Sequence, residues 1–70
     1  MDILVFSTSV KSKYEVQSLT PLINSLVGKG QWNFALDDSE RILRIVSSRV
    51  SPLNAINLLK EHGFECNELK

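Results

Sequence analysis

Two short segments of this chain, at residues 3–6 and 42–46, are apolar at almost every position. Successive side chains of a strand point to opposite faces of a sheet, so a strand that is apolar on both faces suits the middle of a sheet. Runs of four or five residues rich in branched and aromatic side chains are typical of strands. The sequence therefore predicts two central strands, and the rest of the chain has to supply the sheet edges and the cover.

A first helix is indicated between the two apolar runs. Its apolar residues recur at steps of three and four, as on one face of a helix: Val16, Leu19, Ile23, Leu26 and Val27. Ser12 with Glu15 fits a capping box at the start, and Gly28 is a typical end. Thr20 with Pro21 also fits an N-cap followed by a first helical residue, so the pattern leaves open whether the helix kinks or restarts there.

A second helix is predicted after Ser51-Pro52, which form an N-cap and first-residue pair. Gly63 is expected to cap its other end. Its inner face is expected to consist of Leu53, Ala55, Ile56 and Leu59.

Two amphipathic strands complete the pattern. Trp32, Phe34 and Leu36 alternate with more polar neighbours and are interpreted as core residues rather than as an aromatic binding stripe. Residues 37–40 form a polar turn that leads into the strand at 42–46. Near the C-terminus, Phe64, Cys66 and Leu69 are expected on the inner face of a last strand.

The resulting order is β-α-β-β-α-β in a single domain over residues 1–70. Right-handed crossovers in both β-α-β units give an antiparallel sheet of strand order 4-1-3-2 with two helices on one face. This is an α+β, ferredoxin-like open sandwich. It places the two strands that are apolar on both sides in the centre and the two amphipathic strands at the edges.

Charge and cysteine content bound the partners and the compartment. Eight basic residues balance eight acidic ones, and the sequence pI is near 6.5, so we expect neither nucleic acid nor a membrane as a partner. The lone cysteine, Cys66, cannot form an internal disulfide, and the short apolar start resembles neither a signal peptide nor a membrane span. A cytoplasmic location is therefore predicted.

The chain resembles the heavy-metal-associated domain family, the copper-chaperone-like domains, over nearly its whole length. The closing LLKEHGFECNEL is similar to the final helix, Gly-aromatic turn and last strand of that family, and WNFALDDSERILRIV is similar to its hairpin. The family motif is Met-x-Cys-x-x-Cys in the first loop, with a valine four residues after the second cysteine. Counting back from Val16 places Ser12 and Ser9 at the cysteine positions and Ser7 at the methionine position.

Serine at both thiol positions changes the chemistry that the resemblance implies. Soft Cu(I) is bound by polarisable thiolates, whereas a serine hydroxyl is hard and neutral at pH 7. The resemblance therefore implies the fold of a metal carrier with a degenerate metal-binding loop, and we expect no metal there. Ser12 and Glu15 at a helix start also suggest an anion site beside Lys11 and Lys13, but such helix caps are common without one.

Other ligands and catalytic groups are few. His62, Cys66, Asp37 and Asp38 are weak metal candidates, because the topology brings the first loop, the hairpin turn and the His62-Gly63 turn to the same end of the sheet. Zinc needs three or four convergent ligands, and Cys66 at an inward position is better explained as a small core residue. We find no pattern of catalytic residues and expect no enzymatic activity and no cofactor.

The second face of the central strands is the remaining functional feature. Whichever face packs on the helices, the other keeps an apolar set, either Ile3 and Val5 or Leu4 and Phe6 on the first strand. On the third strand the choice is likewise Leu43 and Ile45 or Ile42 and Val46. Nothing in the predicted topology covers this face, so association is expected there, although arginine and lysine side chains could instead drape over it.

These observations favour a non-catalytic interaction or sensing module, acting as a homodimer or with an unidentified protein partner. Two alternatives stay open at this point. One is residual metal binding or trafficking through His62, Cys66 and the acidic turn. The other is a small-ligand regulatory domain, since amino-acid-sensing domains share the β-α-β-β-α-β order.

Overall fold

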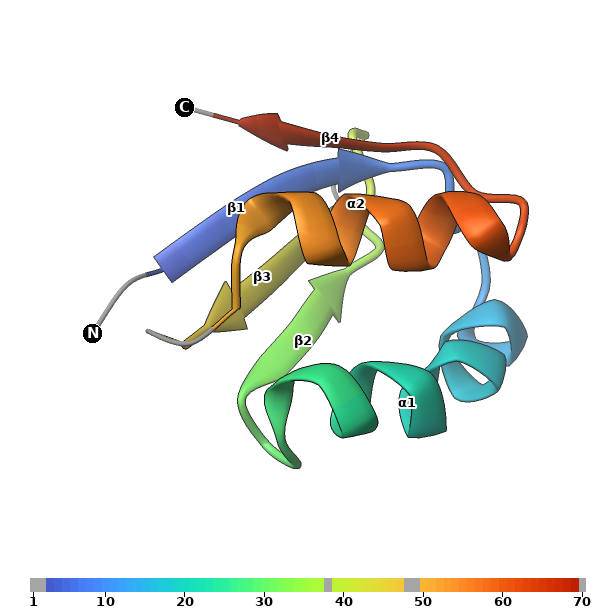
Figure 1. Cartoon of the computed structure of the whole chain (residues 1–70). Helices are drawn as coiled ribbons and strands as arrows, with labels where there is room; N and C mark the ends of the chain where they lie inside the picture. The colour runs from blue at the N-terminus through green and yellow to red at the C-terminus, as the bar shows by residue number, and fades with distance from the viewer. Residues whose placement is uncertain (1–2, 38, 48–49, 70) are drawn as a thin grey trace.

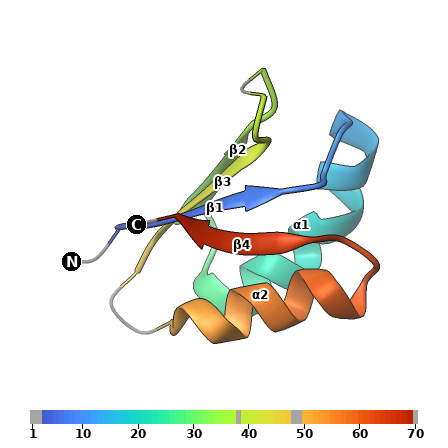
Figure 2. The same ribbon diagram turned by 90° about the horizontal axis from the view of Figure 1, so that it is seen from above.

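The computed structural model of the chain describes residues 3–37, 39–47 and 50–69. The elements follow in the order β1 (Ile3–Thr8), α1 (Lys13–Val27), β2 (Trp32–Ala35), β3 (Ile42–Val46), α2 (Pro52–Glu61) and β4 (Cys66–Leu69). The strands form one antiparallel sheet of order β2-β3-β1-β4, and both helices lie on one face of it (Figures 1 and 2). This is the predicted ferredoxin-like arrangement, and β1 and β3 are its central strands. Neither helix is long and apolar enough to cross a membrane within the residues that the structure describes.

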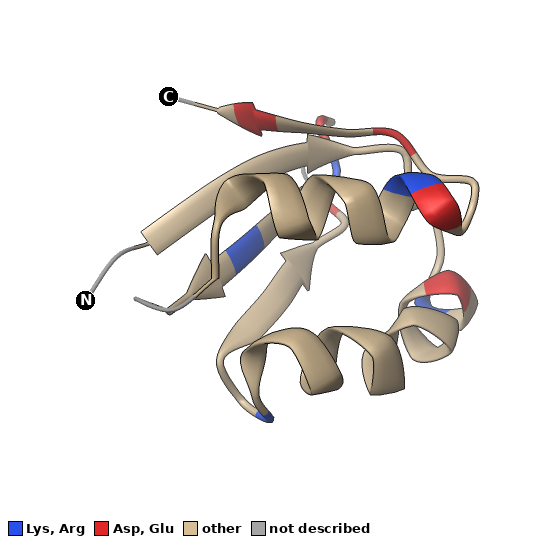
Figure 3. Cartoon of the chain, in the orientation of Figure 1, with Lys and Arg blue, Asp and Glu red and all other residues tan. Residues whose placement is uncertain are grey.

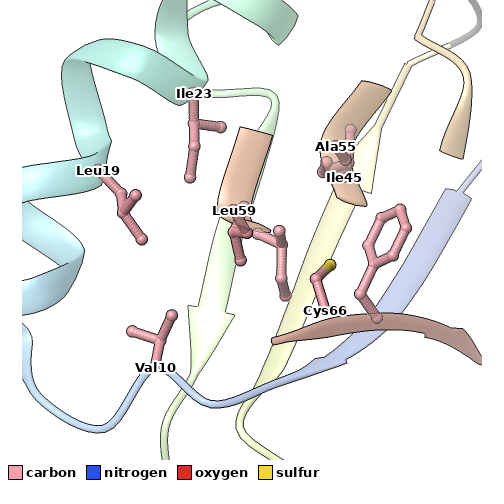
Figure 4. Close-up of a cluster of buried hydrophobic side chains, with 9 residues drawn as sticks. Val10, Leu19, Ile23, Ile45, Ala55, Leu59 and Cys66 are labelled. Atoms are coloured by element: carbon pink, nitrogen blue, oxygen red, sulfur yellow. The ribbon is translucent and has the colours of Figure 1, made fainter. Parts of the chain in front are cut away.

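The core lies between the sheet and the two helices (Figure 4). Phe6 of β1 and Leu43 and Ile45 of β3 face the helices and are buried. From the other side they are covered by residues of α1 and α2, all buried: Leu19, Ile23, Ala55 and Leu59. Burial of these aliphatic and aromatic side chains is the main favourable contribution to folding.

Helix α1 has the predicted start and remains a single helix through Pro21. The Ser12 side chain accepts a hydrogen bond from the Glu15 backbone N–H (3.2 Å), as a cap should. Pro21 is exposed and has no N–H, so the Gln17 carbonyl receives no hydrogen bond from position 21. Gly28 ends the helix at a φ of 112°, a backbone region that favours glycine.

Helix α2 buries the predicted Ala55 and Leu59 and half-buries Ile56, but Leu53 is 62% exposed. The expectation for Leu53 is wrong because it precedes Ala55 by two residues, about 200° around the helix. The helix ends as predicted at a left-handed Gly63 (φ 87°). The Gly63 and Phe64 amides donate to the Lys60 and Leu59 carbonyls, so the last turn is satisfied in a Schellman motif.

Strand β4 corrects a second expectation. Cys66 faces the core as predicted, but Leu69 lies three residues further and therefore on the opposite face. Leu69 pairs with Val5 and is 36% exposed, whereas Glu68 takes the helix-side position opposite Phe6. At a sheet edge a half-buried Glu68 can keep its carboxylate in solvent, which explains why the polar residue is tolerated there.

Candidate functional site

The loop between β1 and α1 contains the positions at which the resemblance predicts a degenerate metal motif. Its first part is held by Thr8. The Thr8 hydroxyl donates to the Arg41 carbonyl (2.6 Å) and accepts from the Val10 N–H (3.2 Å). The Thr8 amide donates to the Glu40 carbonyl (3.0 Å), so Thr8 contacts both of the residues that precede β3. Arg41 takes a left-handed φ of 52° there.

The middle of the loop is fixed to the start of β4. The Ser9 amide donates to the Glu65 carbonyl (3.1 Å), and the Ser9 hydroxyl accepts from the Glu65 amide (2.8 Å). The next residue, Val10, is fully buried among the core side chains (Figure 4). The hydrogen bonds of Ser9 thus hold the loop to the start of β4, and the side chain of Val10 forms part of the core. Neither role follows from the local sequence pattern, because the partners are far away in the chain.

The last part of the loop is the cap of α1. The predicted capping box is only half formed in its usual sense. Ser12 caps the Glu15 amide, but the Glu15 carboxylate accepts from the Lys11 amide (2.7 Å), one residue before the cap. The carboxylate still satisfies a free backbone donor near the positive end of the helix. These hydrogen bonds account for the serine and the glutamate without any bound anion.

The three degenerate positions do not surround one site. Ser7 and Ser9 line a shallow polar cleft of about 270 Å³, together with Thr8, Glu40, Glu65 and Asn67. Ser12 is not part of this lining, because it caps α1. The groups in the cleft that could act as metal ligands are hydroxyls, carboxylates and an amide. All of them are hard oxygen or nitrogen ligands that suit Cu(I) poorly.

The weak metal candidates are not gathered either. Asp37 and His62 are both exposed, and His62 is the C-cap of α2. Asp38 lies outside the described residues. Within the described ranges, no three His, Cys, Asp or Glu side chains are placed to share a metal ion.

Cys66 is the only thiol of the chain, and its surroundings oppose metal binding. It is 1% exposed and belongs to the core cluster, as the sequence predicted. Burial raises the pKa of the Cys66 thiol to about 11, although Lys60 nearby acts in the opposite direction. A buried thiol of this kind is protonated at neutral pH, whereas the thiolate is the metal ligand.

On the face of the sheet opposite the helices, the open sheet face, the structure decides between the apolar pairs that the sequence left open for each central strand. The open sheet face consists of Ile3 and Val5 on β1 and Ile42 and Val46 on β3, because the register places Ile3 opposite Val46. The register therefore does not combine Ile3 and Val5 with Leu43 and Ile45, nor Leu4 and Phe6 with Ile42 and Val46, as candidate interaction faces. Leu43, Ile45 and Phe6 are buried in the core, and Leu4 packs against it.

The exposed part of the open sheet face is one aliphatic patch. Ile3 is 62% exposed, Leu69 is 36% exposed, and Val5 and Val46 are half-buried. Val5 is the direct cross-strand neighbour of Leu69, and Ile3 is that of Val46, so the four side chains are contiguous. Ile42, at 9% exposure, adds little to the surface. We call Ile3, Val5, Val46 and Leu69 the aliphatic patch.

Charged residues leave most of the open sheet face free. Among the strand positions that the structure describes on this face, one residue is charged. It is Arg44, which lies beside Val5. Arg41 does not drape over the patch, because its guanidinium donates to the Leu36 carbonyl within the hairpin. Charged residues are also present where α1 begins and α2 ends (Figure 3).

Trp32, Phe34 and Leu36 face the helices as predicted, but they are only half-buried. The Trp32 indole N–H donates to the Asn24 side chain of α1 (2.8 Å), and the Trp32 and Phe34 rings meet edge to face at 5.9 Å. Together with the first turns of α1 they line a groove of about 610 Å³. The sequence indicated core residues here, and period-two alternation could not show that α1 leaves part of these side chains uncovered.

A scan against models of protein families, a search of curated proteins and a search of solved structures each found no match for this chain. The resemblance to heavy-metal-associated domains therefore rests on the element order and on the loop and turn positions given above.

Proposed function

We propose that this domain is a non-catalytic interaction module that associates through the aliphatic patch. The partner that we propose is a second copy of the same chain. The observation that carries the proposal is the contiguity of Ile3, Val5, Val46 and Leu69 on the sheet face opposite the helices. A two-fold interface brings the same patch from both copies together, so an aliphatic surface is complementary to itself. Arg44 lies beside the patch and supplies a polar rim.

A metal-carrier role is not part of this proposal, despite the resemblance to the heavy-metal-associated family. Ser9 and Ser12 already use their hydroxyls to accept backbone hydrogen bonds, and neither offers a thiolate. We propose that the loop between β1 and α1 has a structural role and does not bind soft metal ions. Titration of the reduced protein with Cu(I), followed by amide NMR, is expected to leave residues 7–13 unchanged. Stoichiometric shifts there would contradict this part of the proposal.

Sedimentation equilibrium of two matched variants tests the association. Ile3→Glu places a charge in the aliphatic patch, whereas Leu53→Glu places the same charge on α2 at an equal exposure of 62%. We expect wild type and Leu53→Glu to show a mass above that of the monomer that rises with concentration, and Ile3→Glu to remain monomeric. A wild-type mass that stays monomeric, or an equal effect of both substitutions, would contradict self-association through the patch.

A further inference from the structure

The groove beside β2 offers a second surface, separate from the aliphatic patch. One wall is the first part of α1, with Lys13, Val16 and Gln17, and the other is β2 and the residues that follow it. Val16, Phe34 and Leu36 give the groove an apolar lining and also pack against the core. A cavity of about 610 Å³ with such a lining has room for several apolar side chains.

The β2 strand borders this groove with unpaired backbone groups. β2 is an edge strand, and β3 is its sheet neighbour. The Val46 amide donates to the Gln31 carbonyl (2.7 Å), which fixes the alternation of the ladder. Asn33 and Ala35 then exchange hydrogen bonds with β3, while the N–H and C=O groups of Trp32 and Phe34 point away from it. The edge therefore presents two donors and two acceptors at the spacing of an extended chain.

These two features together select the kind of occupant. A small apolar molecule would fill the groove but leave the edge groups unpaired. An extended peptide does both, because its backbone pairs with Trp32 and Phe34 while its alternate side chains enter the groove. The β2 strand of a second copy fits less well, since its own helix-side residues already pack against its own core.

We propose that the groove between α1 and β2 binds an extended apolar peptide segment of a protein partner, which adds to the β2 edge as an antiparallel strand. Peptide residues directly opposite Trp32 and Phe34 turn their side chains into the groove and their N–H groups toward β2. The charges of Lys13 and Asp37 at the rim are of opposite sign, which favours a segment without net charge over this stretch. Branched apolar residues at every second position fit this pattern best.

A designed peptide tests the proposal. The probe is the acetylated and amidated heptapeptide Lys-Thr-Val-Thr-Val-Thr-Glu, which has no net charge and whose two valines face the same side of a strand. Amide NMR titration is expected to shift residues on both walls of the groove, Val16 and Gln17 as well as Trp32 and Phe34. Hydrogen exchange of the Trp32 and Phe34 amides is expected to slow by about tenfold at saturation, because these amides gain partners.

Two methylated peptides separate strand addition from general stickiness. N-methylation of the two valines removes the N–H groups that face β2, and we expect it to weaken binding by about tenfold or more. N-methylation of the first and last threonines alters amides that face away from β2, and the affinity is expected to stay within about threefold. Equal weakening by both, or no shifts at either wall up to the solubility limit of the peptide, would overturn the proposal.

Protein variants complete the test. Val16→Thr puts a hydroxyl into the apolar wall and is expected to weaken binding, whereas Thr20→Val one turn later lies outside the groove lining and is expected not to. Ile3→Glu is expected to bind the peptide like wild type, so the groove can fail or succeed independently of the aliphatic patch. Groove shifts that follow protein concentration without peptide would show a second copy at the β2 edge and would also overturn the proposal.

Discussion

At the scale of single residues, Arg41 combines an unfavourable backbone with two favourable contacts. Its φ of 52° is unusual for a residue with a side chain. Its guanidinium binds the Leu36 carbonyl, and its own carbonyl accepts from the Thr8 hydroxyl. Replacement by alanine or by glycine removes the guanidinium in both cases. The difference in the free energy of unfolding between the two variants therefore reports the cost of the backbone conformation alone.

We expect Arg41→Gly to be more stable than Arg41→Ala by about 1 kcal/mol, because glycine adopts a left-handed conformation without steric cost. Urea unfolding of both variants measures the difference. The same pair at Arg44, an exposed position within β3, is the control and is expected to show the opposite sign. An alanine variant at least as stable as the glycine variant at position 41 would contradict the strain argument.

Cys66 gives the protein a specific dependence of stability on pH. The folded-state pKa of its thiol is about 11, raised from an ordinary value of 9.0 by burial. Above pH 9 the unfolded chain loses this proton while the folded chain keeps it, so the contribution is complete below pH 9 and is lost toward pH 11. We expect the free energy of unfolding to fall more steeply over this window in wild type than in Cys66→Ala. Parallel curves from pH 8 to 11, measured by urea unfolding, would contradict the assignment.

At the scale of elements, periodicity was sufficient to predict where helices and strands lie but not how each one faces its neighbours. The face of β1 and β3 could not be chosen, because both strands are apolar on both sides and only the register decides. Leu53 was wrongly expected on the inner face of α2, because the spacing of apolar residues constrains a residue in the first helical turn only weakly. The roles of Ser9 and Val10 were out of reach, since Ser9 binds a backbone group 56 residues away in the chain.

Pro21 lies within α1, and its removal is expected to stabilise the protein. A proline inside a helix costs about 3 kcal/mol through its missing hydrogen bond and its ring, and it returns up to about 1 kcal/mol by restricting the unfolded chain. Pro21→Ala is therefore expected to raise the free energy of unfolding by about 2 kcal/mol, measured in urea. Ser25→Ala, also exposed on α1, should change it by less than about 0.7 kcal/mol. A destabilised Pro21→Ala would mean that the native helix needs the proline geometry.

At the scale of the whole molecule, the topology was predictable because crossover handedness leaves few arrangements for a β-α-β-β-α-β chain. The two candidate surfaces were not equally predictable. An uncovered sheet face follows from having two helices and one sheet, whereas the groove depends on how far α1 covers the edge strand β2. A 70-residue domain has a small core, so contacts outside it carry a larger share of the stability.

The proposed pairing of aliphatic patches predicts that the stability of wild type depends on the protein concentration. If the aliphatic patches pair, dimer formation removes free folded monomer, and each tenfold rise in concentration above the dissociation constant stabilises a chain by about 0.7 kcal/mol. With a urea slope near 1 kcal/mol/M for a domain of this size, the midpoint should rise by about 0.7 M per tenfold step. Unfolding curves from about 5 μM to about 500 μM cover two such steps. Leu53→Glu should keep this concentration dependence and Ile3→Glu should lose it. A wild-type midpoint that stays constant over this range would contradict self-association and would mean that any partner of the patch is a different protein.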